Sequence, residues 1–146
     1  MPEVDEELKI TVDNYATISG KRLFILPNVM NRSSRKVTVD EGREVDYVFD
    51  YPYTDIDSVE IEIPTGYGIE AMQPPVDLKT KFGTYFSKVK LEGTKLTYYR
   101  KMERFAGRYS AKDGSALEEF YGTIFKADRT KLVLVRKEGE AVKKGA

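Results

Sequence analysis

Cysteine, histidine and tryptophan are all absent from this chain of 146 residues. Without cysteine there can be no disulfide bond and no thiol nucleophile. Without cysteine and histidine together, neither a Ser-His-Asp triad nor a Cys-His pair can form, and the usual nitrogen and sulfur ligands of zinc are missing. The kinds of catalysis that the composition still allows use a pair of carboxylates, a Ser-Lys pair or a metal bound by oxygen ligands. We therefore expect a protein that is not an enzyme, with no catalytic residue, no cofactor and no metal.

The chain also lacks net charge and long apolar runs. Lysine and arginine number 24, as do aspartate and glutamate, so the formal charges cancel. No basic excess indicates nucleic acid or an anionic membrane as a partner. No apolar run approaches the roughly 20 residues that span a bilayer, and the acidic N-terminus has no apolar signal-peptide region. We expect no nucleic-acid partner, no membrane span and no signal peptide in these residues.

The length fits one domain, because a chain of this size can bury about two-thirds of the surface that it exposes when unfolded. We therefore expect a single β-sandwich domain over residues 1–146. Its core should run from about residue 8 to residue 137. The segments 1–6 and 138–146 are then expected to be flexible tails.

Alternation of apolar and polar residues predicts several half-buried strands of an antiparallel sheet. It appears in residues 8–18, in residues 45–53 and in residues 59–63. In the second of these, the odd positions from Val45 to Tyr53 are expected to point inward. The apolar run at residues 23–26 predicts a strand that is covered on both sides, and the run at residues 132–135 predicts the last strand.

Turn residues separate these segments. In Pro64-Thr65-Gly66, proline sets φ for the first central position of a turn, and glycine accepts a positive φ. Gly93 is expected to close a short hairpin whose arms are residues 84–91 and 95–105.

One segment has helical spacing. Its apolar residues fall at i, i+3, i+4, i+7 and i+8, at Leu117, Phe120, Tyr121, Ile124 and Phe125. Ser115 followed by Glu118 predicts a capping box at the start of this helix. The predicted fold class is mainly β: an antiparallel β-sandwich with one amphipathic helix near the C-terminus. An immunoglobulin-like sandwich is one possibility within this class.

The charges are separated along the chain. Residues 40–70 hold ten acids and one base, and residues 79–112 hold ten bases and two acids. In one interpretation, these segments are neighbouring strands whose solvent-facing charges pair across the ladder. In the other, they form an acidic face and a basic face, one of which docks a neighbouring domain or a ligand.

Seven residues are the candidates for an interaction surface: Tyr51, Tyr53, Asp55, Asp57, Tyr98, Tyr99 and Arg100. In the stretch Phe49-Asp50-Tyr51-Pro52-Tyr53-Thr54-Asp55, Pro52 lacks a ladder donor and predicts a strand end. The tyrosines there either close the end of the core or form an exposed platform for a sugar or a peptide. The spacing of the acids matches no calcium loop. Tyr98 and Tyr99 should point to opposite faces of one strand.

The order of several landmarks resembles a known bacterial module. These landmarks are residues 49–53, 63–67, 82–85, 107–109 and the helix that runs into residues 127–134. Over about residues 8–137, the chain is similar to the C-terminal β-domain, a domain of unknown function, of bacterial transglutaminase-like proteins that are common in Bacteroidetes.

The resemblance implies a function. It implies a non-catalytic accessory domain of an exported protein, in the periplasm or at the cell surface, that packs against or positions the transglutaminase-like core domain of the same chain. The catalytic cysteine, histidine and aspartate of such proteins belong to that core, so no active-site residue is carried over to this chain. The alternative expectation is a carbohydrate- or peptide-binding β-sandwich module.

Overall fold

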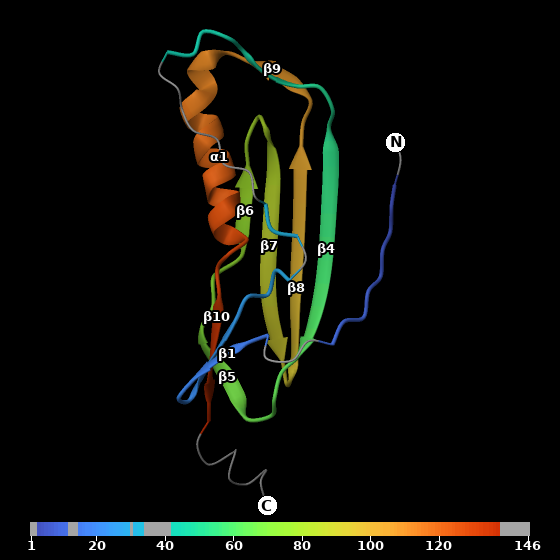
Figure 1. Ribbon diagram of the computed structural model, residues 1–146, viewed down its shortest axis with the longest axis vertical. Coiled ribbons are helices and arrows are strands. Elements are labelled where there is room, and N and C mark those ends of the chain that lie inside the picture. The colour runs from blue at the N-terminus through green and yellow to red at the C-terminus, as the bar shows by residue number, and fades with distance from the viewer. Residues whose placement is uncertain (1–2, 12–14, 30, 34–41, 138–146) are drawn as a thin grey trace, which may run out of the picture.

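The computed structural model describes residues 3–11, 15–29, 31–33 and 42–137. Within them lie ten strands and one α-helix, arranged in three antiparallel sheets (Figure 1). The long sheet has the order β4 (Tyr53–Glu62), β8 (Lys95–Arg104), β7 (Gly83–Glu92), β6 (Val76–Lys79). The small sheet has the order β1 (Thr17–Ser19), β2 (Arg22–Ile25), β10 (Leu132–Arg136), β5 (Tyr67–Ala71). A two-stranded ribbon pairs β3 (Tyr47–Phe49) with β9 (Gly107–Tyr109).

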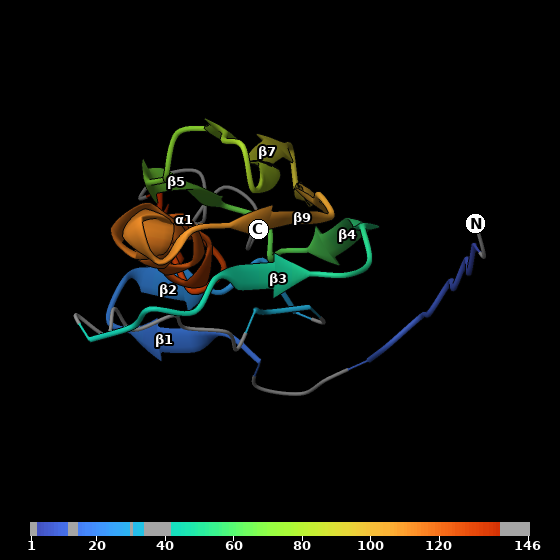
Figure 2. The same ribbon diagram turned by 90° about the horizontal axis from the view of Figure 1, so that it is seen from above.

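The helix and the small sheet share one face of the long sheet. Helix α1 (Gly114–Ala127), preceded by one 3₁₀ turn at Ala111–Asp113, covers one half, and the small sheet covers the other (Figures 1 and 2). This arrangement confirms the predicted class, a mainly β fold of antiparallel sheets with one helix near the C-terminus. No helix among the described residues is long and apolar enough to cross a membrane.

The core has two parts, one under each cover. The helix cluster consists of Phe49, Phe82, Tyr85, Met102, Leu117, Phe120, Tyr121, Ile124 and Ala127. The sheet cluster consists of Leu23, Ile25, Ile63, Leu96, Leu132 and Leu134. Strand β8 contributes to both, because it runs the full length of the long sheet.

The β7–β8 hairpin forms as its turn residues predict. Its strands pair from Gly83 to Glu92 without a register shift, and Glu92 lies opposite Lys95 across a two-residue turn. Gly93 in that turn has a φ of 60°, which glycine adopts without steric cost. The predicted turn at Pro64-Thr65-Gly66 is also present, with a φ of 95° at Gly66.

The predicted strand at residues 8–18 is wrong. Residues 3–11 are extended but pair with no described strand, Leu8 and Ile10 are exposed, and only Thr17–Ser19 forms a strand, β1. Val12 lies outside the described residues. Alternation shows which side chains could share a face, but a strand needs a neighbour that binds its backbone groups.

The predicted continuous strand at residues 45–53 is also wrong. β3 ends at Phe49 and β4 begins at Tyr53, so the chain leaves one sheet at Asp50 and enters another after Pro52. The alternation of faces starts anew at that break. Tyr51, in the break, is 77% exposed, and Val45, which precedes β3, is 72% exposed, whereas Phe49 within β3 is buried.

The helix is where the spacing predicts it, but its start is different. Leu117, Phe120, Tyr121 and Ile124 are buried against the long sheet, as predicted. The capping box is not formed: the N-cap residue is Asp113, without a side-chain capping bond, and Ser115 lies inside the helix. The preceding 3₁₀ turn bonds the Asp113 N–H to the Ser110 carbonyl, so the helix continues from a turn that has already formed.

The two charged segments become neighbouring strands. β4 from the acidic segment pairs along its whole length with β8 from the basic segment. Lys95 Nζ lies 3.1 Å from Glu60 Oε1, and both side chains are more than half exposed. This contact supports the interpretation of charge pairing across the ladder, and each such exposed pair contributes only a few tenths of a kcal/mol.

Candidate functional site

A buried ion pair lies where the two core clusters meet. Arg100 on β8 is 1% exposed, and Asp128, directly after helix α1, is fully buried. The guanidinium donates two hydrogen bonds to the carboxylate, Nε to Oδ1 at 2.8 Å and Nη2 to Oδ2 at 2.9 Å. This bidentate geometry is the strongest that an arginine and a carboxylate adopt. It ties the C-terminal end of the helix to the centre of the long sheet.

Asp128 binds two further donors. The Tyr85 hydroxyl on β7 donates to Oδ1 at 2.8 Å, and the Ser33 N–H donates to Oδ2 at 2.8 Å. Four hydrogen bonds thus offset the cost of burying the carboxylate. They also join parts of the chain that are 43 and 95 residues from Asp128.

A second carboxylate faces the same guanidinium. Asp57 on β4 has its Oδ2 3.6 Å from Arg100 Nη1, and this oxygen also accepts a hydrogen bond from Asn31 Nδ2 at 2.9 Å. Asn31 is held in turn by Asn28, whose side chain both donates to the Asn31 carbonyl and accepts from its N–H. The segment at residues 31–33 is therefore fastened at two points, by Asn31 to β4 and by Ser33 to Asp128 at the end of α1. We call Asp57, Tyr85, Tyr98, Arg100 and Asp128 the Arg100 cluster.

The electrostatics of the Arg100 cluster favour a permanently charged arginine. Burial alone would lower the pKa of Arg100, but the hydrogen bonds and the charge of Asp128 raise it by more. The pKa of Tyr98 is raised chiefly by burial, with Tyr85 and Asp128 adding to the effect. Burial also raises the pKa of Tyr85. Tyr85 and Tyr98 are therefore neutral at physiological pH, and Arg100 is charged.

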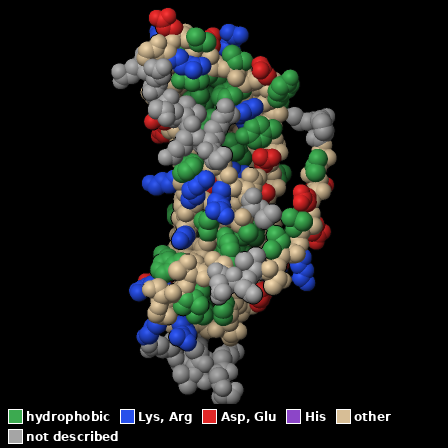
Figure 3. Space-filling model, in the orientation of Figure 1, with side chains coloured by type: hydrophobic (Ala, Val, Ile, Leu, Met, Phe, Trp, Pro, Cys, Tyr) green, Lys and Arg blue, Asp and Glu red, His purple; other side chains and the backbone are tan. Residues whose placement is uncertain are grey.

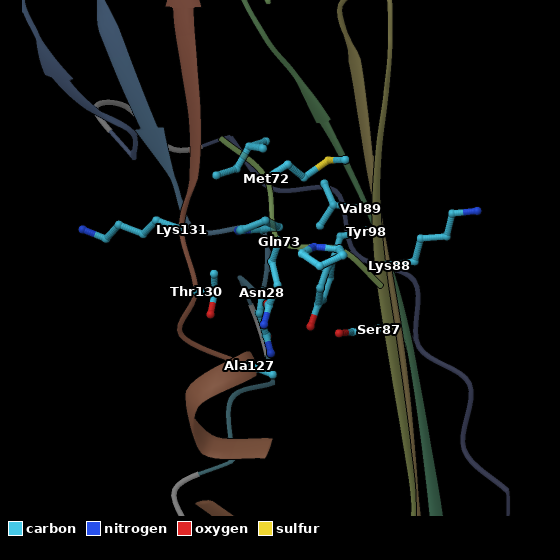
Figure 4. Close-up of a pocket in the computed structure, with 13 residues that line it drawn as sticks. Asn28, Met72, Gln73, Ser87, Lys88, Val89, Tyr98, Ala127, Thr130 and Lys131 are labelled. Carbon is cyan, nitrogen blue, oxygen red and sulfur yellow. The ribbon is translucent and has the colours of Figure 1, made fainter. Parts of the chain in front are cut away.

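A small cavity lies beside the Arg100 cluster. Its volume is about 20 Å³, room for one water molecule, and its walls include Asn28, Ser87, Tyr98 and Ala127. Figure 4 shows the Tyr98 hydroxyl close to Ser87 at one end, while Lys131 points away from the cavity. The Tyr98 hydroxyl is buried and has no hydrogen-bond partner of normal geometry among the described residues.

The chemistry of the Arg100 cluster is that of a cross-link. Its guanidinium is enclosed and is shared between two carboxylates of this chain, so it offers no free face to an anionic ligand. The described residues contain no group of three or more aspartate or glutamate side chains placed to hold a metal ion. The arrangement joins β4, β7, β8, the end of α1 and the loop before β3.

The candidate residues of the interaction surface do not gather at one place. Tyr51 is exposed at the break between β3 and β4, whereas Tyr53 is partly buried, with the Arg104 guanidinium 4.7 Å from its ring centre. Arg104 also lies 4.9 Å from the Phe49 ring and donates to the Tyr51 carbonyl at 2.9 Å. The stretch from Phe49 to Asp55 is therefore a corner of the chain held by one arginine.

The remaining candidates divide between the two faces of the long sheet. Tyr98 and Tyr99 do point to opposite faces, as predicted: Tyr98 is 5% exposed and Tyr99 is 38% exposed. Asp55 is exposed and Asp57 is partly buried. The expectation that Tyr98 and Arg100 belong to an exposed surface is wrong, because both are buried. Arginine is buried here because Asp128 lies within reach.

Asp128 and Tyr85 were missed by sequence reasoning. Asp128 follows the helix and resembles an ordinary solvated linker residue. A signal was nonetheless present: Arg100 shares the parity of Leu96, Tyr98 and Met102 on β8, which places a cation on the apolar face. A cation on a buried face requires a carboxylate partner. Which carboxylate supplies it depends on the three-dimensional path of the chain.

The buried tyrosines predict a loss of stability in alkaline solution. Burial raises the pKa of Tyr85 and Tyr98 above the ordinary value of 10.0. Above about pH 10, the unfolded chain loses these two protons while the folded chain keeps them, so the free energy of unfolding falls as pH rises. The expected slope is about 1.4 kcal/mol per pH unit for each tyrosine.

Urea unfolding at several pH values between about 9 and 11 measures this slope. Tyr98→Phe removes one of the two groups, and its hydroxyl has no partner of normal geometry to lose, so the slope should fall by about half. A variant with the same slope as the wild type would show that Tyr98 ionises freely in the folded state.

Comparison with known proteins gives one match. A family model described as "Domain of Unknown Function with solved-structure structure (DUF3858)" matches residues 21–134, which is more than half of the chain. No curated protein and no solved structure matches the chain. The matched range begins just before β2 and ends within β10, so it includes both core clusters and all of the Arg100 cluster. On this basis the chain belongs to the DUF3858 family.

Proposed function

We propose that this domain is a non-catalytic accessory domain of an exported transglutaminase-like protein, and that it packs against or positions the core domain of the same chain. The observation that carries the proposal is the order of landmarks between residues 49 and 134, which resembles the C-terminal β-domain of such proteins in Bacteroidetes. The site chemistry is compatible with it, since the Arg100 cluster is closed and the full sequence contains no histidine or cysteine. The location that follows is the periplasm or the cell surface.

The first experiment is to read the coding DNA on both sides of this segment. The proposal expects a transglutaminase-like core, with its own cysteine and histidine, encoded upstream in the same reading frame, together with an export signal. A reading frame without such a core would overturn the proposal.

A second experiment tests the packing itself. The core is expressed with and without this domain, and the thermal unfolding of each form is followed. Packing between the domains should raise the melting temperature of the core in the joined protein, because contacts made only in the folded state stabilise it. Two independent transitions at the temperatures of the separate domains would contradict packing.

A binding module for glycans or peptides is the second candidate, and one observation favours it. Tyr99 and Phe86 form a ring pair on the outer face of the long sheet, with ring centres 6.0 Å apart. Tyr99 is 38% exposed, and Lys88 lies opposite it on β7. Because tryptophan is absent, tyrosine fluorescence can follow titration with a panel of glycans, and Tyr99→Ala is the matched control. Binding that survives Tyr99→Ala would exclude this face.

A further inference from the structure

Strand β4 forms a long, regular edge of the long sheet. It is the last strand on its side, and its ten residues pair one-to-one with β8 without a register shift. The opposite edge, β6, has only four residues and directly follows Pro74 and Pro75. Short strands and prolines are two ways in which proteins protect a sheet edge against further pairing. β4 also follows a proline, Pro52, but it is ten residues long and contains no proline, so most of its edge lacks this protection.

The ladder shows which backbone groups of β4 face outward. The Ile63 N–H donates to the Thr94 carbonyl at 2.9 Å, next to the pair of Glu62 with Lys95. Because bonded and non-bonded pairs alternate in an antiparallel ladder, the odd residues of β4 bind β8 and the even residues point away from it. The outward N–H and C=O groups belong to Thr54, Ile56, Ser58, Glu60 and Glu62. These five residues are all exposed.

Apolar surface accompanies this row of backbone groups. Ile56 is 59% exposed on the outer face of the sheet, and Val59 and Ile61 are only partly buried on the inner face. A strand added beside β4 would cover side chains on both faces and would bind the outward N–H and C=O groups at the same time. Main-chain bonds supply affinity in such strand addition, and side-chain contacts supply specificity.

The charges of β4 select the kind of strand that can pair with it. The strand contains Asp55, Asp57, Glu60 and Glu62 and no basic residue. Two copies of β4 placed side by side would bring together two strands that each carry four acids and no base, and this like charge disfavours their pairing. The chain's own segment 3–11 is also acidic, as the red side chains along the right edge of Figure 3 show. Charge therefore disfavours both forms of pairing within the protein.

We propose that the β4 edge accepts an extended segment of another polypeptide, one that alternates apolar residues with lysine or arginine. Its basic side chains would lie beside Glu60 and Glu62 on the outer face, and its apolar side chains beside Val59 and Ile61 on the inner face. This proposal does not depend on the proposed function, because it needs only the edge and its charges.

The test uses a ten-residue peptide that alternates valine with lysine, added to the isotope-labelled domain, with amide hydrogen exchange measured by NMR. At a peptide concentration ten times the Kd, exchange at Ile56, Ser58 and Glu60 should slow about tenfold. The amides of Val59 and Ile61 already bind β8, so their exchange should change little. The same peptide with glutamate in place of lysine is the control, and it should protect none of these amides. Raised salt should weaken binding of the lysine peptide.

Two variants locate the site. Ser58→Pro removes one outward N–H and leaves the bonds to β8 in place, so it should abolish the protection, whereas Ser58→Thr should retain it. The second variant combines Asp55→Asn, Glu60→Gln and Glu62→Gln, and should bind the lysine peptide about tenfold more weakly. Absence of protection at the even residues, equal protection by the glutamate peptide, or unchanged binding to the triple variant would each overturn the proposal.

Discussion

Replacing Asp128 with asparagine should lower the free energy of unfolding by about 3 to 5 kcal/mol. The change keeps the size of the side chain but removes its charge, and Arg100, only 1% exposed, would then keep only the longer 3.6 Å contact with Asp57. A buried guanidinium that loses its bidentate carboxylate loses far more in hydration than a neutral amide can restore. The hydrogen bond from the Ser33 N–H would weaken in the same step.

Urea unfolding of the variant and of the wild type gives this difference. Asp55→Asn is the matched control, because Asp55 is exposed, and it should change the free energy of unfolding by less than about 0.5 kcal/mol. The double variant Arg100→Met with Asp128→Leu removes both charges and should recover much of the loss. If Asp128→Asn cost less than about 1 kcal/mol, the cluster would not be the cross-link described above.

Replacing Phe120 with alanine should lower the free energy of unfolding by about 3 to 5 kcal/mol. Phe120 is 2% exposed in the helix cluster, with its ring centre 5.9 Å from that of Phe82 and 5.2 Å from that of Tyr121. Truncation removes these contacts and leaves a cavity between α1 and the long sheet. The expected loss therefore combines the transfer energy of the ring with the cost of the cavity.

Thermal and urea unfolding measure this loss. Glu119→Ala, one position earlier on the exposed face of the same helix, is the control and should shift the free energy by no more than about 0.5 kcal/mol. An unchanged melting temperature in Phe120→Ala would contradict the packing of α1 against the sheet.

Sequence reasoning predicted the elements whose apolar pattern and partners are close together along the chain. The β7–β8 hairpin and the buried face of α1 are examples, since a two-residue turn and a period of 3.6 residues define them locally. The N-terminal strand was wrong because alternation in residues 8–18 says nothing about whether a neighbouring strand exists. The inward placement of Tyr51 was wrong because β3 ends at Phe49 and β4 begins at Tyr53, so Tyr51 lies in the connection between two sheets, where the parity of a strand no longer applies.

The candidate site was predicted less well than the fold. Sequence reasoning placed Arg100 on a surface because it flanks the Tyr98-Tyr99 pair, one ring of which was expected to point outward, in the basic segment of residues 79–112. Its burial depends on Asp128, Tyr85 and Ser33, which lie 28, 15 and 67 positions away along the chain and meet only after folding. Such contacts carry no local sequence signal, apart from a cation at an apolar parity of β8.

The small sheet has a consequence for the order in which the domain can fold. The helix cluster uses residues 49–127, and most of its members lie after Phe82. The sheet cluster, in contrast, needs β2 near one end of the chain and β10 near the other, because Leu23 pairs opposite Leu134. Contacts that close long loops form late. During synthesis, β2 therefore has no partner on the side of β10, and Leu23 and Ile25 are expected to stay exposed until β10 has left the ribosome.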